Sequence, residues 1–252
     1  MSYTATEMMT IAAARALRNT DICFVGIGMP SAACNLARLT HAPDITLIYE
    51  SGTIATKPDV LPLSIGDGEL CDTALTTVSV PEMFRYWLQG ERFTVGFLGG
   101  AQTDRFANLN TTVIGAYDKP KTRLPGGGGA PEISSACGEI FIIMRQSARS
   151  FVEKLDFVTS FGHGAGGDHR ARMGLKTKGP TKLVTDLAVF EPDPASREMT
   201  VVSVHLGVTR DHIAANTGWP VRYATGVRET PAPSDHELAV LRELHARTAS
   251  RL

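Results

Sequence analysis

The chain has 252 residues, of which 43% are hydrophobic and 20% charged, as in ordinary globular proteins and unlike disordered ones. Its 25 Lys and Arg residues against 26 Asp and Glu residues give a formal charge of −1. This balance gives no support to binding of nucleic acid or of an anionic membrane, because both need a basic surface. No apolar run approaches the roughly 18 residues needed to cross a bilayer.

Hydrophobic patterning predicts helices that alternate with short strands. In the first half we expect a helix over 4–19 that opens with a capping box, a strand over 22–25, a helix over 30–39, a strand over 45–49, a helix over 81–89 and a strand over 93–98. In the second half we expect strands over 140–145, 156–161, 183–190 and 199–205 and helices over 211–216 and 234–250. The pattern favours an α/β sandwich. We expect one domain over 1–252, because the Pro-containing stretch 230–233 is too short to mark a second one.

The N-terminus lacks the basic-then-apolar layout of a signal peptide. The four cysteines are far apart in the sequence, which favours buried small hydrophobic residues over a metal site or a disulfide framework. We therefore expect a cytoplasmic protein.

A glycine-rich turn follows the first strand. Gly26-x-Gly28-x-x-Ser31 precedes a helix, and Glu50 ends the next strand, so the arrangement is similar to a dinucleotide-binding fingerprint. The third glycine of that fingerprint is a serine here. We therefore favour a tight strand-to-helix turn over a cofactor site.

Three features carry more chemistry. Glu50 stands at the end of a predicted strand, where active sites of open α/β sheets lie, although many such acids are only solvated turn residues. Four consecutive glycines, Gly126–Gly129, cost conformational entropy, so their backbone must approach something closely or take positive φ angles. The polar segment Gly99–Asp104 also follows a strand, and it either builds a site or satisfies an irregular backbone.

Other patterns are less informative. His163 lies in the glycine-rich stretch Gly162–Gly167 and could be a base, whereas His41, His205 and the other histidines have no nearby Ser/Asp or Cys partner pattern. No spaced His or Cys set predicts a metal site. A cluster of basic residues with almost no acids could bind phosphates, although such runs are more often solvated loops; it comprises Arg170, Arg172, Lys176, Lys178 and Lys182.

Taken in order, these motifs resemble those of the beta (B) subunit of class I coenzyme A transferases. The matching segments are Val25–Pro30, Ile48–Gly52, Gly99–Asp104 with Asn108 and Asn110, Pro125–Ala130, Val184–Phe190 and Gly207–Thr209. Ala107 departs from the pattern, because the family usually has glycine there. Three further stretches are most similar to the beta (B) subunit of 3-oxoadipate CoA-transferase, itself akin to the beta (B) subunit of glutaconate CoA-transferase: 123–126, 146–151 and 217–219.

The resemblance implies a three-layer α/β/α sandwich with a mostly parallel sheet. It also implies a ping-pong enzyme that moves CoA from an acyl-CoA, succinyl-CoA foremost, to a short dicarboxylate such as 3-oxoadipate. Glu50 would be the nucleophile, passing through a mixed anhydride to a glutamyl-CoA thioester. Backbone N–H groups of two loops are expected to bind CoA and the oxyanion; these loops comprise Gly99, Gly100, Ala101 and Gln102, and Gly126, Gly127, Gly128 and Gly129.

By the same resemblance we expect no metal and no cofactor, with CoA as a substrate, and a homologous alpha (A) subunit in an α2β2 assembly. A glutaconate-type transferase and a CoA-thioester hydrolase of the same fold are alternatives, although related ring-opening hydrolases lack the glutamate motif that is intact here. A non-catalytic nucleotide-binding module is the alternative from another class. An arginine should bind the distal carboxylate of a diacid, and the sequence does not distinguish Arg123, Arg145 and Arg149, nor exclude one from the alpha chain.

Overall fold

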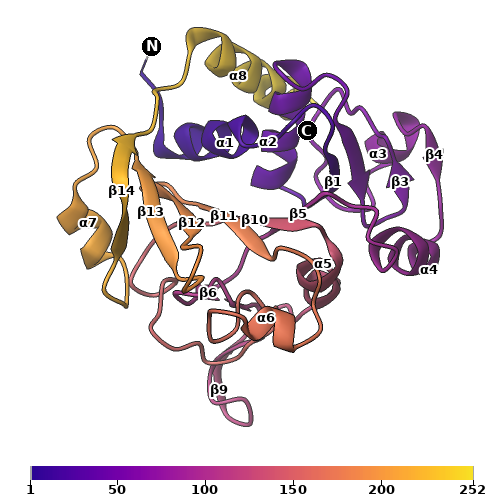
Figure 1. Ribbon diagram of the computed structural model, residues 1–252. Coiled ribbons are helices and arrows are strands. Elements are labelled where there is room, and N and C mark those ends of the chain that lie inside the picture. Colours follow the sequence, from indigo (N-terminus) through magenta and orange to yellow (C-terminus); the bar gives the residue numbers. More distant parts are fainter. Residues whose placement is uncertain (1, 252) are drawn as a thin grey trace. The chain divides into compact units, whose positions relative to one another are not determined.

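The computed structural model describes residues 2–251, and they fall into two compact units (Figure 1). The first unit holds residues 2–97 and 232–251, and the second holds residues 98–231. The single domain expected over residues 1–252 stays a prediction. No helix within the described residues is both long and apolar enough to cross a membrane.

The first unit is built on a βαβ motif with further helices. Strand order is β5-β1-β2-β3-β4, with β1 parallel to β2 and β5 and with antiparallel pairs at β2–β3 and β3–β4. Its elements are α1 (Ala5–Arg15), β1 (Ile22–Val25), α2 (Met29–Leu39), β2 (Thr46–Tyr49), β3 (Thr53–Ile54), α3 (Gly68–Asp72), β4 (Thr76–Thr77), α4 (Val80–Glu82), the π-helix η1 (Met83–Leu88), β5 (Val95–Leu98) and α8 (Asp235–Ala249).

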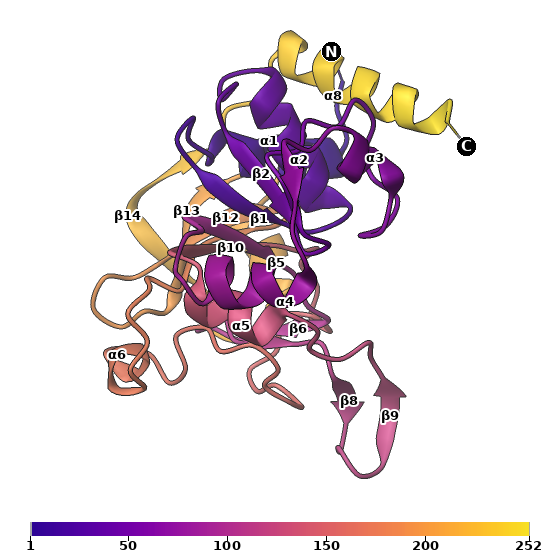
Figure 2. The ribbon, with the colours of Figure 1, turned by 90° about the vertical axis from the view of Figure 1, so that its right-hand side faces the viewer.

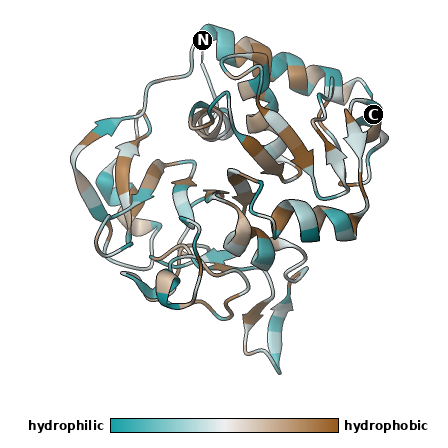
Figure 3. Ribbon diagram, turned by 45° about the vertical axis from the view of Figure 1, so that its right-hand side comes forward, coloured by the Kyte–Doolittle hydropathy of each residue, from teal (hydrophilic) through white to brown (hydrophobic). Residues whose placement is uncertain are grey.

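Helices cover both faces of the central strands β1 and β2, which Figure 3 shows as mostly hydrophobic. Phe24 on β1 contacts the ring of Phe84 on η1, with ring centroids 6.2 Å apart. The next residue on the strand points to the opposite face, where Val25 pairs with Tyr49 and the Tyr49 hydroxyl meets Ser31 on α2. Helices α1, α2 and α8 contact one another. The expected α/β sandwich is thus confirmed.

The second unit has the strand order β10-β11-β12-β13-β14, with parallel pairs at β10–β11 and β13–β14 and antiparallel pairs between them. Two small hairpins lie outside this sheet, and Figure 2 shows the hairpin β8–β9 projecting from the unit. The elements are β6 (Gln102–Thr103), β7 (Leu109–Asn110), β8 (Val113–Gly115), β9 (Pro120–Arg123), α5 (Ala130–Ala136), β10 (Glu139–Ile143), α6 (His169–Arg172), β11 (Pro180–Val184), β12 (Ala188–Pro192), β13 (Met199–Val204), α7 (Arg210–Ala215) and β14 (Arg222–Glu229).

Two strand predictions are wrong. The apolar stretch 183–190 is not one strand but the antiparallel pair β11–β12. Its turn forms because the Thr185 hydroxyl accepts hydrogen bonds from the N–H groups of Leu187 and Ala188, a local alternative to an extended backbone. The stretch 156–161 forms only an isolated bridge between Leu109 and Ser160.

Candidate active site

Glu50 lies where the sequence places it, directly after β2. Because β1 and β2 are parallel with Val25 opposite Tyr49, Glu50 and the Gly26–Gly28 turn share the carboxyl edge of the strands, where α/β sheets place active sites. Glu50 is half-buried. Its carboxylate has no hydrogen bond or ion pair with residues 2–251, so it is available to react.

A tight turn fixes the backbone at Glu50. The Gly52 N–H donates to the Tyr49 carbonyl at 3.0 Å, and the Val78 N–H donates to the Gly52 carbonyl at 2.9 Å. Gly52 has φ +100°, and a Cβ there would lie 1.9 Å from the Val78 oxygen. Glycine is therefore required by the close approach of two backbone segments.

Two hydroxyls beside Glu50 are not satisfied by the protein. Ser51 Oγ and Thr53 Oγ1 are buried and lack a hydrogen-bond partner among the described residues. Buried polar groups are nearly always paired. Ser51 directly follows Glu50, and this hydroxyl is a candidate contact for a bound substrate.

The residue before Glu50 is tied to α2 by a buried hydrogen bond. The buried Tyr49 hydroxyl bonds Ser31 at 2.7 Å, and burial raises the pKa of Tyr49 above its usual value, so the phenol stays neutral. The Gly26–Gly28 segment is the strand-to-helix turn favoured by the sequence: Gly28 has φ +83° and Pro30 lies in the first turn of α2.

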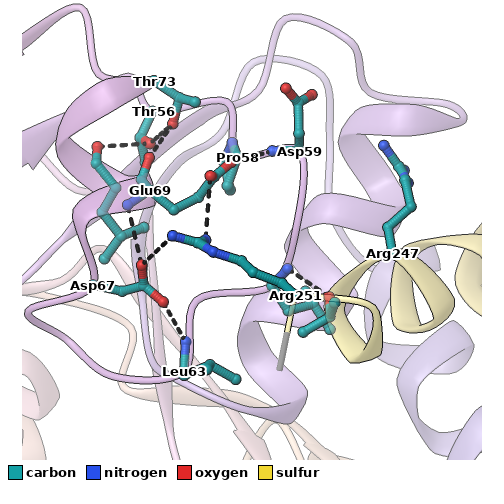
Figure 4. A network of polar contacts seen from close by, with 12 residues as sticks. Thr56, Pro58, Asp59, Leu63, Asp67, Glu69, Thr73, Arg247 and Arg251 are labelled. Atoms are coloured by element: carbon teal, nitrogen blue, oxygen red, sulfur yellow. Dashed lines mark hydrogen bonds and ion pairs between the residues drawn. The ribbon is translucent and has the colours of Figure 1, made fainter.

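A polar network anchors the segment that follows β3 to the end of the chain (Figure 4). The Thr56 hydroxyl donates to the Leu70 carbonyl at 3.0 Å. Arg251 reaches Asp67 and Glu69, both at 3.3 Å. The Leu63 N–H also donates to Asp67, and this bond is the main reason that the pKa of that carboxyl is lowered. The chain leaving the Glu50 turn is thereby held on α3 and α8.

In the second unit, the two predicted loops differ in which backbone donors are free. The Ala101 N–H donates to the Asn110 carbonyl at 2.9 Å, and the Gly126 N–H donates to the Thr111 carbonyl at 2.8 Å. These two donors are therefore used by the protein. Within residues 2–251, no backbone hydrogen bond engages the N–H groups of Gly99, Gly100 and Gly127–Gly129.

The structure brings these loops together through one short segment. The Asn110 carbonyl accepts from Ala101 of the first loop, and the carbonyl of its neighbour Thr111 accepts from Gly126 of the second. The Thr111 hydroxyl also donates to the Gly126 carbonyl at 2.8 Å. Thr159 supports the same segment by accepting from the Thr111 N–H at 2.9 Å. The free donors thus lie on two loops fixed to adjacent residues.

Gln102 has a supporting role in this arrangement. Its amide nitrogen donates to Asp156 at 2.9 Å, and its oxygen accepts from the Asn110 side chain at 2.7 Å. The side chain is buried. The Gln102 side chain therefore positions the loop, because both its amide nitrogen and its oxygen are bonded to other residues of the chain.

The three candidate arginines are now distinguishable. Arg123 lies over the Tyr117 ring at 4.9 Å and donates to the Tyr117 carbonyl, and Arg145 has a partner in the chain. Arg149 is exposed, without a hydrogen bond or ion pair to the described residues. Its loop lies beside the first glycine loop, because the Thr103 N–H donates to the Ser150 carbonyl at 2.7 Å.

Sequence reasoning missed Thr111 and Thr159. Neither belongs to a motif, and Thr159 falls in a predicted strand that does not form. Only the pairing of segments almost 50 residues apart reveals them. As for metals, no group of three or more His, Cys, Asp or Glu residues within 2–251 could hold an ion.

Comparison with known proteins agrees with this geometry. The family model "Coenzyme A transferase" matches residues 6–216. The beta (B) subunit of 3-oxoadipate CoA-transferase from Pseudomonas knackmussii is 61% identical over 99% of this chain and 96% of its own. The beta (B) subunit of glutaconate CoA-transferase from Acidaminococcus fermentans is 33% identical over 96% and 92%.

Solved structures agree as well. The crystal structure of glutaconate coenzyme A-transferase from Acidaminococcus fermentans superposes with a TM-score of 0.89 at 30% identity, over 96% of this chain and 94% of that one. The resemblance inferred from the motifs is confirmed. The chain therefore belongs to the coenzyme A transferase family, in which it corresponds to the beta subunit of a CoA-transferring enzyme.

Proposed function

We propose that this chain carries the nucleophile of a transferase that moves CoA from an acyl-CoA, succinyl-CoA foremost, to 3-oxoadipate or a similar short dicarboxylate. The observation that carries the proposal is the unpaired carboxylate of Glu50 at the end of β2. The relative that is 61% identical along almost the whole chain supports 3-oxoadipate as the acceptor. A glutaconate-type acceptor has the support of the more distant relative.

A carboxylate nucleophile suits the transfer of CoA between two acids. Attack of the Glu50 carboxylate on an acyl-CoA thioester expels the CoA thiolate and leaves a mixed anhydride. The thiolate then attacks the glutamyl carbonyl, releases the donor carboxylate and leaves a glutamyl-CoA thioester. The acceptor carboxylate runs the same two steps in reverse and restores Glu50. A serine ester would be too stable to be reopened in this way.

Each step passes through a tetrahedral oxyanion. We propose the free N–H groups of Gly99, Gly100 and Gly127–Gly129 as the donors that stabilise it, at roughly 3 kcal/mol for each donor that is aligned. Ala101 and Gly126 remain in these loops as supporting residues, because their N–H groups are already bonded. The mechanism requires no metal and no cofactor other than CoA as substrate.

We propose Arg149 as the group that binds the distal carboxylate of the acceptor, through a charge-assisted bidentate contact. Arg149→Met should raise the KM for 3-oxoadipate about tenfold or more and leave the KM for a monocarboxylate acceptor unchanged. Arg123→Met is the matched control, because Arg123 is occupied by Tyr117. Equal effects of the two variants would contradict this role of Arg149.

We further propose that a homologous alpha chain completes the enzyme as an α2β2 assembly in the cytoplasm. The relative is itself named as one subunit of a larger enzyme, which supports this partner. The chain purified alone should show no transferase activity, and addition of the alpha chain should restore it. Full activity of the single chain would refute the requirement.

The covalent intermediate is the decisive test. The assembled enzyme incubated with acyl-CoA and no acceptor should gain the mass of CoA on the peptide that contains Glu50, and borohydride should inactivate it only after acyl-CoA is added. Glu50→Gln should lower turnover by several orders of magnitude because the amide cannot attack as an anion, whereas the exposed Glu91→Gln serves as the control. Steady release of free CoA without an adduct would instead identify a thioester hydrolase.

A further inference from the structure

The second unit contains a pocket that the proposed mechanism does not use. It has a volume of about 590 Å³ and lies between the Gly162–Gly167 loop, the α6 region (Figure 1) and the turn from β12 to β13. This size is within the range of small-molecule sites. Its described lining holds one carboxylate, Asp168, against four cations: Arg170, Lys176, Lys178 and Arg197.

Two of these cations are already committed. The buried Arg170 guanidinium donates to the carbonyls of Ser134 at 2.7 Å and Gly162 at 3.0 Å and to the Thr177 hydroxyl at 2.6 Å. It therefore fixes the walls of the pocket to each other. Lys178 lies 3.7 Å from the Glu139 carboxylate.

The single carboxylate of the lining is neutralised from outside the pocket. Asp168 accepts from the Arg172 guanidinium at 2.9 Å. The side chains of Lys176 and Arg197, by contrast, are exposed and have no hydrogen bond or ion pair within residues 2–251. They come from different walls, one on the segment after α6 and the other on the β12–β13 turn. The pocket thus presents two unpaired cations and no unpaired anion.

Arg197 is held there in a strained conformation. Its φ of +62° is unfavourable for a residue with a Cβ by roughly 1 kcal/mol or more. Asp193 maintains the turn by accepting from the Ser196 N–H at 2.8 Å, and the Gly167 N–H donates to the Ser196 carbonyl at 2.9 Å. Such strain persists where the surroundings over-determine it, and it is enriched at ligand sites.

Apart from the hydrogen-bonded Arg170, the buried part of the lining is uncharged and partly apolar. His163 is buried, and its Nε2 donates to the Pro180 carbonyl at 2.7 Å. Burial lowers the pKa of His163 to about 4, with the hydrogen bond to Pro180 opposing the shift. Leu175, Pro192 and Pro194 add apolar surface. The unpaired positive charge is therefore that of the exposed Lys176 and Arg197.

From this juxtaposition we infer a binding site for a compact organic phosphate, with its phosphate groups between Lys176 and Arg197 and its body against Pro192 and Pro194. Two sources share this chemistry: the adenosine 3′,5′-bisphosphate end of CoA, in which case the inference rests on the proposed function, and a free nucleotide that acts as an effector.

Isothermal titration of the assembled enzyme with adenosine 3′,5′-bisphosphate tests the site. The double variant Lys176→Gln/Arg197→Gln should bind about tenfold more weakly or worse. Lys119→Gln/Arg228→Gln removes the same charges from exposed positions outside the pocket and should bind like the wild type. If Arg197→Gln impairs folding, Lys176→Gln against Lys119→Gln gives the same comparison.

Kinetics then identify the source. A raised KM for acyl-CoA, with an unchanged KM for an acyl-pantetheine that lacks the nucleotide, assigns the site to CoA. An unchanged KM for acyl-CoA, with loss of bisphosphate binding, assigns it to a free effector. Absence of wild-type binding at millimolar ligand, or equal loss in the control, overturns the inference. The Glu50 adduct is measured separately, so failure here leaves the proposed function intact.

Discussion

Two glycine-rich loops of the second unit have similar compositions and opposite surroundings. In the loop over 162–167, a Cβ on Gly162 would lie 2.2 Å from the Ala107 carbonyl oxygen, and one on Gly166 would lie 2.5 Å from the Ser196 oxygen. In the loop over 126–129, a Cβ on Gly126 or Gly128 would meet no atom within 4 Å. Glycine thus permits close packing in one loop and unusual φ angles beside open space in the other.

The backbone donors differ in the same way. Asn108 accepts from the N–H groups of Gly162 and Gly164 at 2.8 and 3.0 Å. The N–H groups of Gly127–Gly129 have no such partner within the described residues. Glycine enrichment alone therefore does not indicate a ligand site. The hydrogen bonds of the folded chain, and not its glycine content, distinguish the two loops.

The largest expected effect is on the stability of the packed loop. Gly162→Ala forces a Cβ into the Ala107 backbone, where no flexible side chain can move aside. We expect a loss of about 3 kcal/mol, which lowers Tm by roughly 10 °C in a chain of this size. Thermal melts measure the change in Tm. A Tm within about 2 °C of the wild type would show that this loop can accommodate a Cβ at position 162.

The second effect is on turnover, and it comes from a substitution in the loop over 126–129. Gly128 has φ +49°, so Gly128→Ala should cost roughly 1 kcal/mol of stability from backbone strain alone. If its loop binds the reacting groups, turnover should fall on the order of tenfold or more. Gly226→Ala is the matched control, because Gly226 has φ +76° and equally open surroundings on the exposed β14. Equal activity of the two variants would make the 126–129 loop purely structural.

A third effect is a pH dependence of stability to which His163 of the packed loop contributes. Burial keeps the pKa of His163 at about 4 in the folded chain, whereas the unfolded chain takes up the proton near 6.5. Stability should therefore fall as pH is lowered from about 6.5 toward 4, because the unfolded state binds the proton first.

Urea unfolding at several pH values measures this slope. His163→Gln should make it shallower, and the exposed His245→Gln on α8 should leave it unchanged. Identical slopes in wild type and His163→Gln would show that the 162–167 loop opens before the chain unfolds.

Much of the first unit could be predicted because its signals are local. The bounds of β1 and α2 follow from an apolar run, two glycines and a proline at the start of the helix. The capping box of α1 at Thr4 and Glu7 forms as expected. The position of Glu50 at a strand end depends on the same short-range patterns.

Local patterns were less reliable in the second unit. The stretch 183–190 has the composition of one buried strand, yet a single hydroxyl, that of Thr185, bends it into two. In the first unit, too, the helix expected over 81–89 is a short α-helix followed by a π-helix, and its buried residues are Met83 and Leu88. Packing against distant segments decides such details.

By itself the sequence determined the fold class, the family and the glutamate at the strand end, because hydrophobic period, turn residues and motif order are properties of neighbouring residues. Only the tertiary structure decided which groups are free to act. Whether Gly126 or Gly127 offers its N–H depends on Thr111, and whether Arg123 or Arg149 is unoccupied depends on Tyr117. Hydrogen-bond satisfaction is a property of the whole packed chain, since each donor is either used by a residue far along the sequence or left for a ligand.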